Sequence, residues 1–151
     1  MSKKSAKIAG LLEGCRGQKV NANYLGYFEC FNRGLFFEAH DVLEELWLAD
    51  KQSPNHGFYK GLIQLAGAFV HLQKNRLKPS AALFTLARSN LEKYPSVHEH
   101  LDVKHLLGLI AKWLGRLESS KFAINPLSAT PPPQLALLLT YEAIEPPMND
   151  P

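Results

Sequence analysis

The sequence predicts an all-α fold: a single-domain antiparallel bundle of about five helices, with a short extra helix near the C-terminus. Three observations predict it. Apolar residues recur at the helical period of about 3.6 residues through most of the chain, no convincing alternating strand pattern occurs, and prolines and glycines separate the helical segments at short intervals. The 151 residues, 46% of them hydrophobic, are enough for one core and few for two.

The prolines divide the chain unevenly. Of the ten, seven fall between Pro126 and Pro151. This distribution predicts a Lys- and Gly-rich leader over 1–19 that is partly disordered, a helical bundle domain over 20–121, and a proline-rich arm over 122–151 that contains the short helix.

The first two predicted helices lie on either side of Gly34. The first covers about 21–33 and carries four aromatic residues on one face: Tyr24, Tyr27, Phe28 and Phe31. Asn21 or Asn23 can cap its N-terminus, and Gly34 suits the left-handed position that often ends a helix. The second covers about 35–50 and ends before a proline-containing break.

Three more long helices are expected. The segment 55–75 is poor in charge, which predicts the most central and most buried helix. The next covers 79–94, with Pro79 in the first turn, where proline is favoured. A leucine-rich stripe predicts another helix over 96–117, and the short extra helix covers 134–142 after three consecutive prolines. Short connections between them favour antiparallel neighbours.

Composition excludes several classes of protein. The net charge is +3 with His neutral, and the longest basic run is Lys3-Lys4, so a nucleic-acid partner is not expected. No apolar run approaches the roughly 20 residues that cross a membrane, and the N-terminus lacks the apolar core of a secretory signal. Cys15 and Cys30 show neither metal-ligand spacing nor a disulfide framework. We expect a cytoplasmic protein without a membrane partner.

The segment 37–47 is the most informative part of the chain. On a helical wheel with about 100° per residue, His40 and Glu44 lie one turn apart between apolar neighbours. Glu38 and Asp41 fall on the outward arc. Burial of ionisable groups costs free energy unless they are paired, hydrogen-bonded or bound to a metal. The pattern therefore predicts either a buried polar network or a site.

One interpretation is a metal site. Imidazole and carboxylate groups at i and i+4 can bind one divalent cation such as Zn, Mn, Fe or Ni. The order His40-Asp41-x-x-Glu44 parallels the zinc-protease pattern His-Glu-x-x-His, and Asp41 then occupies the position of the general base. Glu38 is a second candidate base. Two ligands do not complete a site, so a third must come from elsewhere.

Gln64 and His71 are the next candidates, seven residues apart on one face of the predicted third helix. Small residues beside them would let another helix approach closely, so that both could meet His40 and Glu44. In the alternative, this least apolar side faces solvent. The other four histidines are expected to be solvated: His56, His98, His100 and His105.

The segments that contain His40, Glu44, Gln64 and His71 closely resemble a small bacterial and archaeal family, catalogued as domain of unknown function 309 and often labelled a predicted metal-dependent hydrolase. The resemblance covers about 27–91. It is carried by Phe31-Asn32-x-Gly34, by Phe37-Glu38-Ala39-His40-Asp41-x-Leu43-Glu44-x-x-Trp47, and by Gly61-Leu62-Ile63-Gln64-Leu65-Ala66-x-Ala68-x-x-His71. It implies an all-helical bundle and one motif set of His40, Glu44, Gln64 and His71. Asp41 and Lys60 stand where the family usually has Glu and Gln.

Two functional hypotheses follow. The favoured one is a non-catalytic structural or interaction module, in which the polar residues fix the packing and Trp47, Phe36 and Phe37 anchor the core or the seam of a homodimer. The alternative is a metal-dependent hydrolase with His40, Glu44 and His71 as ligands and with Asp41 or Glu38 as base. The first is favoured because the sequence contains no second catalytic constellation.

Overall fold

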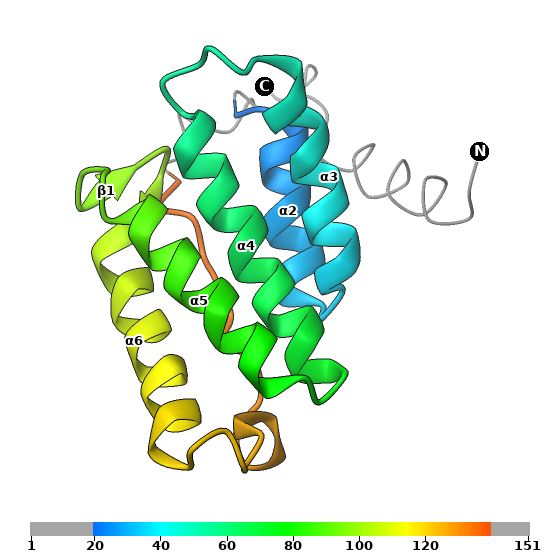
Figure 1. Ribbon diagram of the computed structural model, residues 1–151. Coiled ribbons are helices and arrows are strands. Elements are labelled where there is room, and N and C mark those ends of the chain that lie inside the picture. The colour runs from blue at the N-terminus through cyan, green and yellow to red at the C-terminus, as the bar shows by residue number, and fades with distance from the viewer. Residues whose placement is uncertain (1–19, 140–151) are drawn as a thin grey trace.

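Five α-helices form most of the described part of the chain, residues 20–139, in the computed structural model (Figure 1). They are α2 (Ala22–Asn32), α3 (Phe36–Ala49), α4 (His56–Gln73), α5 (Leu77–Leu91) and α6 (Val103–Ser119). The predicted all-α bundle is confirmed. The expected leader over 1–19 and the end of the arm over 140–151 lie outside the described residues.

Successive helices run in opposite directions and pack in sequence order (Figure 1). Helix α4 lies between α3 and α5, α2 packs on α3, and α6 packs on α5. Helix α4, which is poor in charge, buries nine of its 18 residues, including Phe58, Leu62 and Phe69. No helix among residues 20–139 is both long and apolar enough to cross a membrane.

Local signals set the ends of α2. The Asn21 side chain accepts hydrogen bonds from the backbone N–H groups of Asn23 and Tyr24, at 2.8 and 3.2 Å, and so satisfies two free donors of the first turn. At the other end Gly34 has a φ of 75°, the left-handed conformation that glycine adopts without strain. The predicted cap and the predicted C-terminal glycine are both confirmed.

The expected start of the last long helix near residue 96 was wrong. Residues 97–102 form a small antiparallel hairpin of β1 (Val97–His98) and β2 (Leu101–Asp102). Its turn residues, Glu99 and His100, have φ values of 49° and 62°. Two consecutive left-handed residues make a tight hairpin turn and cannot continue an α-helix. Helix α6 therefore begins at Val103, where Asp102 caps it by accepting from the N–H of His105 at 2.9 Å.

The expected helix over 134–142 was also wrong for its described part. Residues 134–139 are extended and run back along the bundle toward the hairpin (Figure 1). The Asn32 side chain donates to the carbonyl of Leu135 at 2.8 Å and accepts from its N–H at 2.7 Å. These long-range bonds satisfy the backbone groups that a helix would have paired internally. The only helical turn described in this arm is the 3-10 turn η1 (Pro126–Ser128).

Candidate ligand-binding pocket

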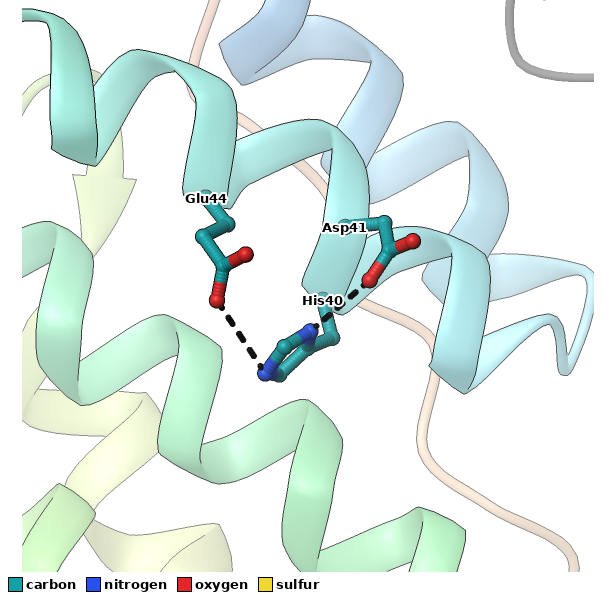
Figure 2. A network of polar contacts seen from close by, with 3 residues as sticks. All are labelled: His40, Asp41 and Glu44. Atoms are coloured by element: carbon teal, nitrogen blue, oxygen red, sulfur yellow. Dashed lines mark hydrogen bonds and ion pairs between the residues drawn. The ribbon is translucent and has the colours of Figure 1, made fainter. Parts of the chain in front are cut away.

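Helix α3 carries a row of ionisable side chains on its outer side. The His40 ring lies between two carboxylates, with Nδ1 3.1 Å from Asp41 Oδ1 and Nε2 3.8 Å from Glu44 Oε2 (Figure 2). The shorter contact is within hydrogen-bond distance, whereas the longer one is an ion-pair separation only.

Apolar residues do not enclose this row as the helical wheel predicted. The His40 and Glu44 side chains are 33% and 41% exposed, and Asp41, expected to point outward, is 26% exposed. Helices α2 and α4 pack on α3 and cover its buried residues, which are Phe36, Ala39, Val42 and Leu43. The predicted buried His/Glu cluster is therefore a half-exposed one.

A cavity of about 310 Å³ lies between α3, α4 and α5. Its nine lining residues are Phe37, His40, Ile63, Gln64, Gly67, Val70, His71, Lys74 and Leu83. The cavity thus brings together three of the predicted site residues, His40, Gln64 and His71. Glu38, Asp41 and Glu44 are not among its lining residues.

The Gln64 side chain is hydrogen-bonded to a residue of α5. Its Oε1 atom accepts a hydrogen bond from Asn90 Nδ2 at 2.7 Å. The small residues of α4 permit the close approach of another helix, as expected, but that helix is α5. A Cβ added at Gly61 would lie 2.8 Å from Leu91 Cγ, and one at Gly67 would lie 3.1 Å from Leu83 Cδ1. Helix α5 therefore forms the second wall of the pocket, which the sequence did not predict.

His71 is the histidine of the pocket whose pKa is shifted. Its Nδ1 atom is buried and has no hydrogen-bond partner among the described residues. Desolvation lowers the pKa of His71, and the nearby charges of Arg76 and Lys74 lower it further. The ring is therefore neutral at pH 7 and acts as a hydrogen-bonding group.

The charges around the pocket are segregated. Helix α3 contains four acidic residues and no Lys or Arg, whereas residues 51–91 contain six Lys or Arg and no Asp or Glu. The pocket lies at this boundary, and Lys74 is the one lining residue with a full charge at neutral pH.

The donor set does not fit a metal ion. In residues 20–139, no three side chains of His, Cys, Asp or Glu lie close enough together to hold one. The lining offers two imidazoles and no carboxylate, and Lys74 beside them would repel a cation.

A family model described as a domain of unknown function (DUF309) matches residues 24–83. Residues 24–83 belong to the DUF309 family. All nine lining residues of the pocket, from Phe37 to Leu83, fall within this segment. No curated protein and no solved structure matches the chain.

A second polar cluster lies at the opposite end of α4, partly beyond the DUF309 segment. The rings of Trp47 and His56 stack at 4.8 Å, and His98 Nε2 lies 2.6 Å from Asn55 Oδ1. The expectation that His56 and His98 are solvated was wrong, since both are half-buried against aromatic rings. No local pattern could have predicted the His98 contact, because it joins residues 43 positions apart.

Proposed function

We propose that this DUF309 chain is a non-catalytic helical module that binds a small ligand in the pocket between α3, α4 and α5. The observation that carries this proposal is the cavity of about 310 Å³, in which apolar walls surround His40, Gln64 and His71, and Lys74 is the one lysine of the lining. Small-molecule sites in proteins have this composition: mostly apolar lining with a few polar groups that orient the ligand.

The chemistry of the lining supports binding over catalysis. None of the nine lining residues is Ser, Thr, Cys, Asp or Glu, so the pocket offers neither an oxygen or sulfur nucleophile nor a carboxylate base. The carboxylates of α3 lie beside the pocket rather than in it. Gln64 is already bonded to Asn90, which suits a residue that orients a ligand.

A pocket-filling substitution tests the proposal. We would screen a library of small apolar fragments by NMR, following the backbone amides of α4. Leu83→Phe should fill the cavity and abolish fragment-induced shifts there. Leu86→Phe is the matched control, because Leu86 lies one turn further along α5, is exposed and does not line the pocket. Fragments that bind Leu83→Phe as well as the wild type would refute the proposal.

A metal-dependent hydrolase is the second candidate. One observation favours it: the His40–Glu44 pair at 3.8 Å on α3, with His71 lining the same pocket as His40. In this alternative His71 would be the third ligand, and Asp41 or Glu38 the base, although no three such side chains in residues 20–139 lie close enough together to hold an ion. Metal analysis of protein purified without added metal decides between the candidates. The binding-module proposal predicts a sub-stoichiometric content of Zn, Mn, Fe or Ni that His40→Ala does not change.

Self-association is a separate prediction. Helix α3 is acidic, whereas residues 51–91 are cationic, and Leu48 is an exposed apolar residue of α3. Such surfaces favour association that weakens as salt screens the charges. Light scattering at low and high ionic strength would measure it, and a monomer under both conditions would exclude it.

A further inference from the structure

The sign of the charge at one end of the pocket restricts the kind of ligand. Lys74 lies at the C-terminal end of α4, and Arg76 follows two residues later. The chain on either side of them in sequence, residues 51–91, contains no acidic residue. The carboxylates of α3 beside the pocket, Glu38, Asp41 and Glu44, are not among its lining residues. The effect of both cations on His71 indicates that their field reaches the pocket wall.

Helix dipoles do not reverse this sign. The C-terminus of α4 carries partial negative charge, but α5 begins at Leu77, a few residues after α4 ends at Gln73, and its N-terminus carries partial positive charge. The last carbonyls of α4 are also bonded. The N–H of Arg76 donates to the His71 carbonyl at 2.8 Å, and Asn125 Nδ2 donates to the Leu72 carbonyl at 2.7 Å. The formal charges therefore decide the potential at this end of the pocket.

His71 adds a hydrogen-bond donor at the same end. Its ring is neutral, so one nitrogen carries a proton and the other a lone pair. A proton on the buried Nδ1 would have no acceptor among the described residues, and buried N–H groups without acceptors are rare. We therefore assign the proton to Nε2, which makes that atom a donor for a ligand.

We propose that the pocket binds a small amphipathic carboxylate, with its anionic group beside Lys74 and His71 and its apolar part against Ile63, Val70 and Leu83. One cation and one neutral donor suit a single negative charge, whereas phosphate groups are typically bound by several cations or by arginine forks. The volume of about 310 Å³ lies at the lower end of the roughly 300–1,000 Å³ range of ligand pockets, so the ligand is small.

This inference rests on the proposed function, and a matched ligand series separates the two. Octanoate, octan-1-ol and octylamine share one apolar tail and differ in the charge of the head group. We expect octanoate to bind roughly tenfold more tightly than octan-1-ol, as one charge-assisted hydrogen bond would give. Octylamine should bind most weakly. Isothermal titration would give the Kd values, and NMR shifts of the α4 amides would place the ligand.

Lys74→Met is the decisive variant. It should bring the Kd of octanoate close to the Kd of octan-1-ol measured with the same variant. Lys78→Met is the matched control, since Lys78 is also exposed but does not line the pocket, and it should keep the preference for octanoate. Thermal melting of both variants checks that they fold.

The outcomes are distinct. Equal binding of octanoate and octan-1-ol in the pocket would overturn the carboxylate inference and leave the proposed function standing. Tightest binding of octylamine, or an octanoate preference that survives Lys74→Met, would also overturn it. If none of the three ligands shifts the pocket amides, the inference and the proposed function fail together.

Discussion

Asn90 on α5 donates a hydrogen bond to Gln64 on α4 at 2.7 Å and so ties one polar residue of the pocket to the opposite wall. Both side chains are half-buried, and they lie beside the closest approach of the two helices, where Gly61 faces Leu91. This contact links the packing of α4 and α5 to the shape of the pocket. Its consequences for stability and binding can be measured separately.

Asn90→Ala should lower the free energy of unfolding by about 1 kcal/mol, because the amide oxygen of Gln64 loses its donor in a half-buried site. Urea denaturation would measure the loss. Ser89→Ala, at an exposed neighbouring position of the same helix, serves as control and should leave the unfolding midpoint within about 0.5 kcal/mol of the wild type. Equal stability of the two variants would show that the Asn90–Gln64 bond does not contribute.

Gly61→Ala should destabilise the protein by roughly 1–3 kcal/mol, because the new methyl group would overpack the α4–α5 interface. An added Cβ would lie 2.8 Å from Leu91 Cγ and 3.2 Å from Asn90 Cβ. Gly108→Ala is the matched control, since a Cβ on that α6 residue would meet nothing within 4 Å. Alanine has the higher helix propensity, so this control should gain about 1 kcal/mol. Changes of the same sign in both variants would contradict the role assigned to Gly61.

Glu44→Gln should change the free energy of unfolding by less than about 1 kcal/mol, because exposed ion pairs are screened by solvent. A buried network would have predicted a large loss for this substitution. The observed pair is half-exposed, with 3.8 Å between His40 Nε2 and Glu44 Oε2. A melting temperature far below that of the wild type would show that the pair is buried in solution, as the helical wheel had predicted.

The lowered pKa of His71 predicts a specific dependence of stability on pH. Above about pH 6.5, the ordinary histidine pKa, the ring is neutral in both the folded and the unfolded chain and contributes nothing. Below that pH the unfolded chain binds a proton more readily than the folded one, so stability falls until the pH reaches the lowered folded pKa.

The measurement is urea denaturation at pH 7.5 and pH 5.0, for the wild type and for His71→Gln. The wild type should lose more stability on acidification than the variant, which lacks the titrating ring. NMR titration of the ring proton on Cε1 would give the folded pKa directly. An identical loss in both proteins would mean that burial of His71 does not oppose its protonation.

Much of this fold could be predicted from local patterns. The helical period identified α2 to α6, and the caps at Asn21 and Gly34 were readable because each acts on groups only a few residues away. The predictions were wrong where residues far apart in the sequence form contacts. Leu135 is extended because Asn32, 103 residues earlier, bonds both of its backbone groups, and no local signal contains that information.

The candidate site also has features that the sequence predicted and features that it did not. Helical spacing alone placed Gln64 and His71 on one face of α4, because side-chain direction along a helix follows from its period. Other features depended on how the helices pack against one another. These are the exposure of His40, the presence of Lys74 and Leu83 in the lining, and the pocket wall formed by α5. The sequence by itself determined the helices and their faces. Only the tertiary structure decided that His40 and His71 share an apolar pocket with a lysine, since that requires α3, α4 and α5 to be packed together.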